Sequence, residues 1–470
     1  MSIIIPANSA VGGGFNVANS IRFDDGSSSY LQKSASGGNR RTFTFSTWVK
    51  RSTLGGGSSG YNTFFSSDQA TANSFRLTFS SNGSDDKIMT YFYTGSQQMQ
   101  LITNRVFRDT SAWYHIVVAV DTTQGTASNR TKLYVNGVQE TSFSTETYPS
   151  QNLEMSVNQS GAPNRVGAGT SLYFDGYMAE TVLLDGTAAS PTSFGEFDED
   201  SGIWKPISVS GLTFGTNGFH LNYETAAELG TDANGGTTLS ETNLTAVDQS
   251  LDTCTNNFAT LNFLAKGSSS TFSEGNLKST TGGANNTSTS TLGISSGKWY
   301  WEYKLPSGSL QYVQMGITTN ESVAASTDVM TNFSGANYCK TAYAAEFRFN
   351  LDGGSYSTDT YGGTQSANDI FQIALDLDNN FIYMGANGTY FNSGNPASGA
   401  SGTGAAKAVV AGVTYFPMMI TLNNNMEINF GSPSFAISSG NADGDGFGNF
   451  EYAVPSGYFA LCTKNLAEYG

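Results

Sequence analysis

Apolar and polar residues alternate along two separate parts of the chain. In the first, residues 42–50 place Phe43, Phe45 and Val49 on one side of an extended chain and mostly polar side chains on the other. Residues 113–121 (WYHIVVAVD) continue the period of two with several β-branched residues. A period of two with β-branched and aromatic residues predicts strands that bury one face.

Turn residues separate these predicted strands. In KLYVNGVQE, Asn136-Gly137 supplies the positive φ angles that a two-residue hairpin turn requires. No long stretch has the period of a helix, and the exception is short: Ser190-Pro191 has the composition of an N-cap followed by a first helical position.

The second alternating part begins at residue 296 with SGKWYWEYKL. We expect one face of this strand to be apolar, with the residues Trp299, Trp301, Tyr303 and Leu305. Residues 370–388 predict a hairpin that turns at Asp378-Asn379-Asn380, and residues 415–431 predict two more strands. Such a density of short strands is typical of sandwiches and barrels.

Residues between the two parts are rich in Thr, Asn and Gly, which indicates a connector and therefore two domains. We predict an all-β protein of two tandem antiparallel β-sandwiches. The predicted boundaries are an N-terminal arm over 1–20, a first sandwich over 21–204, a connector over 205–260 and a second sandwich over 261–470.

Charge narrows the classes of partner. The chain has 22 Lys and Arg against 38 Asp and Glu, a formal net charge of −16. A nucleic-acid partner would require clustered basic residues, so we expect none. No apolar run approaches the length of a membrane span, so we expect no membrane insertion. The start has no basic region of a signal peptide, and three scattered cysteines do not form a disulfide framework.

Motifs in the first part resemble a known superfamily. FTFSTWVKR, WYHIVVAVDTT, NRTKLYVNGVQE and FDGYMAETVLLDG, in this order, resemble the laminin-G-like, concanavalin-A-like lectin/glucanase superfamily over about residues 21–190. The second part resembles a SPRY domain over about residues 260–465. The resemblance implies a concanavalin-A-like jelly roll followed by a SPRY-like sandwich.

The pairing of these domains resembles virion surface proteins of tailed bacteriophages, notably marine ones. It implies a non-enzymatic protein made in the cytoplasm of the host bacterium and carried on the virion surface. We expect a homo-oligomer that contacts other virion proteins through the arm and binds host-cell surface glycans as a tail-fibre or receptor-binding protein. The alternatives are a capsid decoration or head-fibre protein and, outside the virion class, a polysaccharide-degrading enzyme.

Glucanases of the fold that the first part resembles use catalytic carboxylates that alternate along a strand. Glu196, Asp198 and Asp200 have this spacing, but no β-branched residues surround them, which favours a solvated loop. His115 and His220 are isolated from any recognisable nucleophile motif. The sequence therefore predicts no catalytic residues.

Calcium is the one cofactor that the sequence suggests. Asn441, Asp443 and Asp445 alternate before a glycine, as in the first half of a calcium loop, although the Glu expected at the twelfth position is missing. An Asp/Gly-rich turn is the alternative.

The resemblance adds a second acidic group. Asp24, Asp25 and Asp175 fall in loops that bind calcium in some laminin-G-like relatives, and they could equally form turns.

A glycan contact is predicted in the loop 351–364 (LDGGSYSTDTYGGT). Tyr356 and Tyr361 would stack on sugar rings, and Asp352 and Asp359 would accept hydrogen bonds from sugar hydroxyls. Loops on a rigid β scaffold are the usual place for such contacts.

Overall fold

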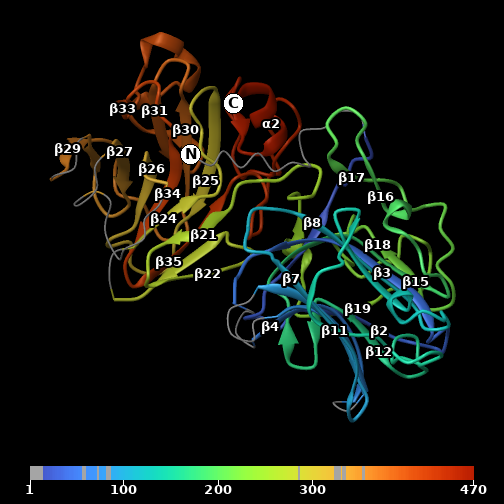
Figure 1. The fold of residues 1–470 in the computed structure, drawn as a ribbon. Coiled ribbons are helices and arrows are strands. Elements are labelled where there is room, and N and C mark those ends of the chain that lie inside the picture. Colours follow the sequence, from blue (N-terminus) through green and yellow to red (C-terminus); the bar gives the residue numbers. More distant parts are fainter. Residues whose placement is uncertain are drawn as a thin grey trace. The chain divides into compact units, whose positions relative to one another are not determined.

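The chain forms two compact units that divide between Thr255 and Asn256. The computed structural model describes residues 14–55, 60–70, 73–80, 86–283, 286–321, 330, 335–351 and 355–470. Figure 1 draws the first unit from blue to green and the second from yellow to red. Each unit contains two large sheets whose strands pair almost entirely antiparallel, so the predicted all-β class with two sandwiches is confirmed.

One sheet of the first unit, called the β3 sheet, has the order β10-β9-β8-β3-β15-β1-β20, with β18 also paired to β15. Its strands are β1 (Ser20–Phe23), β3 (Thr42–Arg51), β8 (Tyr114–Asp121), β9 (Thr131–Val135), β10 (Val138–Gln139), β15 (Gly176–Asp185), β18 (Phe219–Leu221) and β20 (Gln249–Ser250).

The facing β4 sheet has the order β11-β7-β6-β5-β4-β12-β2-β19. Its strands are β2 (Tyr30–Ser34), β4 (Tyr61–Ala70), β5 (Asn73–Ser80), β6 (Lys87–Tyr93), β7 (Gln97–Val106), β11 (Phe143–Thr147), β12 (Pro163–Val166) and β19 (Ser240–Thr242). The shorter elements are β13 (Ala168–Gly169), β14 (Leu172–Tyr173), β16 (Gly195–Phe197), β17 (Trp204–Pro206) and the 3-10 helices at Ala127–Asn129, Pro191–Ser193 and Ala246–Asp248.

The alternation in β3 explains the core between these sheets. Phe43, Phe45 and Val49 are all fully buried in it, and the Phe45 ring stacks on Phe65 of β4 with 4.1 Å between ring centroids. The predicted hairpin between β9 and β10 is confirmed, because Asn136 and Gly137 have φ angles of 49° and 78°.

Residues that we assigned to a connector, 205–260, instead complete the first unit as far as Thr255. They add β18, β19 and β20, and they bury Phe219, Leu221 and Tyr223 in the core. Each strand here has only two or three residues, so the apolar positions were too sparse to show a period. Residues 256–260 belong to the second unit, where Phe258 pairs with Cys462.

Residues near the end of the first unit, including Trp204 and Cys254, cover the outer face of the β3 sheet. Trp48, Trp113 and Tyr177 are buried there together with Val17, Trp204 and Cys254. Val17 belongs to the predicted arm over 1–20, so the described end of that arm packs on the first unit. Residues 1–13 lie outside the described residues.

In the second unit, the β26 sheet has the order β21-β24-β34-β26-β27-β28-β29. Its strands are β21 (Leu261–Lys266), β24 (Asn286–Ser290), β26 (Gln314–Thr318), β27 (Asn337–Thr341), β28 (Glu346–Asn350), β29 (Ser357–Thr360) and β34 (Phe416–Thr421).

The opposing β25 sheet has the order β22-β23-β35-β25-β30-β31-β32, with β33 beside β31 and β36 beside β25. Its strands are β22 (Ser270–Ser273), β23 (Lys278–Thr281), β25 (Lys298–Lys304), β30 (Ile370–Asp376), β31 (Phe381–Ala386), β32 (Thr389–Tyr390), β33 (Lys407–Ala408), β35 (Asn424–Asn429) and β36 (Phe459–Ala460). The remaining elements are 3-10 helices at Phe391–Ser393 and Pro396–Ser401 and helix α2 (Thr463–Tyr469).

The second core follows the predicted face of β25. Trp299, Trp301 and Tyr303 are fully buried in it, and Leu305 lies in the same cluster. In the described parts of the chain, no helix is long and apolar enough to cross a membrane. All three cysteines are buried and free of disulfide bonds.

Candidate functional site

The predicted glycan loop does not present its tyrosines as a stacking platform. Tyr361 is only 2% exposed, and its ring packs edge-on against Phe347 and Phe391. Burial raises the pKa of its hydroxyl to about 12. The structure therefore corrects the prediction at Tyr361, because the chain turns this ring into the core directly after the exposed strand β29.

The other members of this loop are also engaged. Arg348 lies over the ring of half-buried Tyr356, 4.5 Å from its centroid. Asp359 is exposed on β29 and accepts a 2.6 Å hydrogen bond from the Lys407 ammonium. Asp352 lies outside the described residues. In the described part of the loop, the groups that we expected to contact a sugar instead contact other residues of the second unit.

The predicted calcium loop is a hydrogen-bonded turn. The Asp443 carboxylate accepts from four N–H groups, those of the Asp445, Phe447 and Ala460 backbones and the Asn465 amide. Because these bonds occupy the carboxylate, Asp443 ties the loop to β36 and α2.

The other two residues of the predicted calcium loop form hydrogen bonds with different partners. The side-chain amide of Asn441 donates to the carbonyl of Glu451, and Asp445 accepts from the Tyr469 hydroxyl at 2.9 Å. Asn441, Asp443 and Asp445 therefore do not converge on one ion, and the structure supports the Asp/Gly turn that we kept as the alternative.

The carboxylate run is only partly the solvated loop that we predicted: Glu196 is exposed but belongs to β16, and half-buried Asp198 and exposed Asp200 follow that strand. Glu196 and Asp198 both pair with Lys205, at 3.4 and 3.1 Å. Hydrogen bonds from Ser201 lower the pKa of Asp198 to about 2. Asp200 is exposed in the following turn.

Asp24, Asp25 and Asp175, by contrast, come together. One carboxylate oxygen from each of the three residues can be chosen so that these oxygens all lie within 4.8 Å of one another. Asp24 and Asp25 follow the end of β1, and Asp175 precedes β15, which pairs with β1. Antiparallel pairing of Phe23 with Gly176 brings these segments, some 150 positions apart, to one end of the β3 sheet.

Local structure fixes the orientation of this cluster. The Asp175 backbone N–H donates to the Asn62 side chain at 2.9 Å, and its carbonyl accepts from the Ser52 N–H at 3.0 Å. Gly176 follows with a φ of 149°, and a Cβ there would lie 2.2 Å from the Lys50 carbonyl. The strand can approach this closely because the residue after Asp175 is a glycine.

Three hard oxygen donors of this kind fit calcium better than zinc or a soft metal. Two oxygens bound to one calcium ion lie roughly 3 to 5 Å apart, since each Ca–O bond is about 2.4 Å. The cluster meets this requirement. Among the described residues, no other group of three or more His, Cys, Asp or Glu side chains does so.

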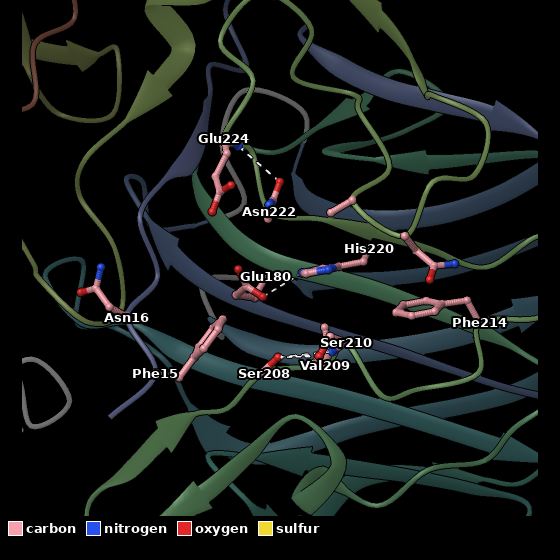
Figure 2. Close-up of a pocket in the computed structure, with 12 residues that line it drawn as sticks. Phe15, Asn16, Glu180, Ser208, Val209, Ser210, Phe214, His220, Asn222 and Glu224 are labelled. Carbon is pink, nitrogen blue, oxygen red and sulfur yellow. Dashed lines mark hydrogen bonds and ion pairs between the residues drawn. The ribbon is translucent and has the colours of Figure 1, made fainter. Parts of the chain in front are cut away.

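A second feature of the first unit is a pocket of about 370 Å³ beside β15 and β18. Figure 2 shows Glu180 and His220 facing each other in it, with Glu224 above and Phe15 to one side. His220 Nε2 and Glu180 Oε2 are 2.8 Å apart. Sequence reasoning treated His220 as isolated and missed this pair, because only the pairing of β18 with β15 brings the two residues together.

Comparison with protein families matches residues 25–192 to a laminin-G family model described as the concanavalin A-like lectin/glucanases superfamily. The match covers the larger part of the first unit, and the predicted resemblance of this unit is thereby confirmed. No curated protein matches the chain in sequence.

Several solved structures are similar to parts of the chain. The SPRY domain of human HERC1 is 16% identical, with 32% of this chain and 87% of that chain covered and a TM-score of 0.25. Domain 4 of an extracellular arabinanase from Geobacillus stearothermophilus, in complex with arabinotriose, is 18% identical, with 34% and 68% covered and a TM-score of 0.26. A native heptameric pentraxin from Limulus polyphemus is 14% identical, with 38% and 80% covered and a TM-score of 0.27.

Proposed function

We propose that this protein is a non-enzymatic, calcium-dependent carbohydrate-binding protein that is displayed on the surface of a phage virion. The observation that carries the proposal is the convergence of Asp24, Asp25 and Asp175 at one end of a sandwich that matches the concanavalin A-like lectin/glucanases superfamily. These three residues would hold the ion. A bound calcium ion can complete its shell of six to eight oxygens with the hydroxyls of a sugar.

Binding rather than catalysis is supported by the partners of the alternating carboxylates. A retaining glycosidase needs two carboxyl groups about 5 to 5.5 Å apart across a cleft, one of them with a raised pKa. Glu196 and Asp198 instead share the ammonium of Lys205, and the pKa of Asp198 is lowered. Neither carboxylate has the environment of a general acid.

The proposal that the protein is displayed on a virion is supported by the resemblance of its two domains, as a pair, to phage surface proteins. A tail-fibre or receptor-binding role would give glycan binding a direct use in adsorption to the host. Immunogold labelling of purified virions tests this part of the proposal: label at the tail tip supports host attachment, label over the head supports the decoration role, and unlabelled virions contradict both.

Retention on insoluble polysaccharide tests binding against catalysis. The protein is incubated with cell-surface polysaccharide of the host in calcium, and the bound fraction and the released sugars are measured together. We expect retention without release of new reducing ends, and loss of retention in Asp25→Asn. The matched control Asp200→Asn, an exposed carboxylate outside the cluster, should be retained like the original chain. Release of reducing ends would contradict the proposal.

A further inference from the structure

The pocket beside β15 has the size and lining of a small-molecule site. Its volume of about 370 Å³ lies within the range of roughly 300–1,000 Å³ for ligand pockets. All of its lining residues belong to the first unit, and none of the three aspartates of the proposed calcium site is among them. The lining includes Phe15, Glu180, Ser210, His220, Asn222 and Glu224.

A bulge in β15 turns Glu180 into this pocket. The register with β3 shifts between Ala179 and Val182, and Glu180 has a φ of 46°. Ala179 precedes the bulge and Val182 follows it, yet both lie in clusters on the outer face of the sheet. Strict alternation would have placed Glu180 with Met178 in the core. Left-handed backbone at a non-glycine residue is strained, and bulges often re-aim a side chain at a functional site.

Neighbouring groups hold the carboxylate in place. His220 bonds to Glu180, and the His220 ring stacks on Phe214 with a centroid distance of 6.3 Å and an interplanar angle of 14°. The His220 backbone is fixed in turn, because its N–H donates to Asp232 at 3.0 Å. The Glu180 side chain is 8% exposed, so a ligand would meet a preorganised and largely desolvated acid.

The charge of the pocket favours a cationic ligand. Glu180 and Glu224 both line it, and no Lys or Arg occurs among the described residues of the lining. Phe15 is 37% exposed, and its ring lies next to Glu180 in the pocket drawn in Figure 2. An exposed aromatic ring next to carboxylates suits either a cation over the ring face or the apolar face of a sugar.

We propose that this pocket binds a small ligand with a protonated primary amine beside several hydroxyl groups, the chemistry of an amino sugar. The amine would lie between the carboxylates of Glu180 and Glu224. Hydroxyls would bond to the amide and hydroxyl groups of the lining, such as Asn222 and Ser210, and Phe15 would cover the apolar face of the ring. This site neither uses nor requires the proposed calcium ion.

Calorimetric titration with three probes tests the proposal. Glucosamine carries the amine, glucose replaces it with a hydroxyl, and N-acetylglucosamine neutralises it. Titrations of the full chain are done with a chelator present, so failure of the calcium site cannot affect the result. We expect binding of glucosamine that is roughly tenfold or more tighter than binding of either other sugar, which corresponds to about 1.4 kcal/mol or more. Equal binding of all three, or no binding of glucosamine, would overturn the proposal.

Variants locate the site. Glu180→Gln and Glu224→Gln should each weaken glucosamine binding by roughly tenfold or more, since each removes one charge contact while keeping the shape of the side chain. Glu199→Gln is the matched control, because Glu199 is exposed in the same unit and does not line the pocket, and this variant should leave binding unchanged. Glu224 is also exposed, so its variant tests the site even if Glu180→Gln fails to fold. Unchanged binding in folded Glu224→Gln would place the ligand elsewhere.

Discussion

His115 shows how the structure determines the state of a single side chain. Trp204 donates its indole N–H to His115 Nδ1 at 3.0 Å, and an indole nitrogen can only donate. Nδ1 therefore carries no proton, and the proton of the neutral ring lies on Nε2, 2.8 Å from the Ser46 hydroxyl. Burial lowers the pKa of His115 to about 3 because nothing compensates the charged form. His115 has a structural role, as its position within a strand indicated.

This burial predicts an acid-sensitive stability. In the unfolded chain His115 takes up a proton as the pH falls through about 6.5, whereas in the folded chain its pKa is about 3. Stability should therefore fall as the pH drops through this interval, by up to about 5 kcal/mol from this group. His115→Gln keeps a donor and an acceptor but cannot titrate, so its urea unfolding curves should lose this part of the pH dependence. His220→Gln is the control, and an equal change in both variants would contradict the account.

A short terminal element of the first unit is held by a buried ion pair. Lys50 of β3 and Asp252, two residues after β20, are 2.6 Å apart and both 1% exposed. Trp113 also donates to Asp252, at 3.1 Å. These bonds close residues 250–255 over the outer face of the β3 sheet, and they explain why this polar segment belongs to the first unit.

Asp252→Ala should strongly destabilise the first unit. Removal of one partner of a buried pair leaves the other charge without compensation, and such losses are about 3–5 kcal/mol. Chemical denaturation measures the loss. Glu154→Ala is the matched control, because its pairs with Arg40 and Arg41 are exposed and should contribute about 0–1 kcal/mol. Similar losses in the two variants would argue against a structural role for the buried pair.

Elements with long alternating patterns could be predicted from the sequence, and the short ones could not. β3, β25 and the hairpin of β30 and β31 follow period-two patterns of seven or more residues or end at clear turn residues. The bulge at Glu180 shifts the alternation by one position, but Ala179 before it and Thr181 and Val182 after it all fit a strand, so the sequence alone does not locate it. Tyr361 was misjudged since it stands among glycines in a polar stretch, although its ring is buried.

At the scale of the whole chain, the division into two units differs from the predicted boundaries. The first unit needs residues as far as Thr255, since β18, β19 and β20 fill the sheets of that unit. The second begins at Asn256, whose neighbour Asn257 bonds to Thr463 at the other end of the same unit. Composition alone placed the change near residue 205, where polar residues become frequent but the fold continues.

Fragments test this division. A fragment of residues 14–255 should unfold in one cooperative transition, and a fragment of residues 14–204 should not, because it lacks Asp252 and the core residues Phe219 and Leu221. Circular dichroism during heating measures this. The fragment 256–470 serves as the control for independent folding of the second unit. Cooperative unfolding of 14–204 would contradict the boundary.

The candidate site could be predicted only in part. The three aspartates came from a resemblance, and the antiparallel pairing of β1 with β15 brings them together. The pair of Glu180 and His220 depends on a strand pairing across 40 positions, which no local pattern encodes. Loop 441–445 has the spacing of a calcium loop, but backbone and amide N–H groups already occupy the Asp443 carboxylate.

The most direct test of the central claim is binding of the purified protein to an array of bacterial glycans, first in calcium and then in excess chelator. Calcium held by Asp24, Asp25 and Asp175 would complete the sugar site, so we predict binding to a defined group of glycans that chelation abolishes and added calcium restores. The variant Asp175→Asn should bind none of them in calcium. Binding that survives chelation to glycans without a free amine, or an array that remains blank in calcium, would contradict the account.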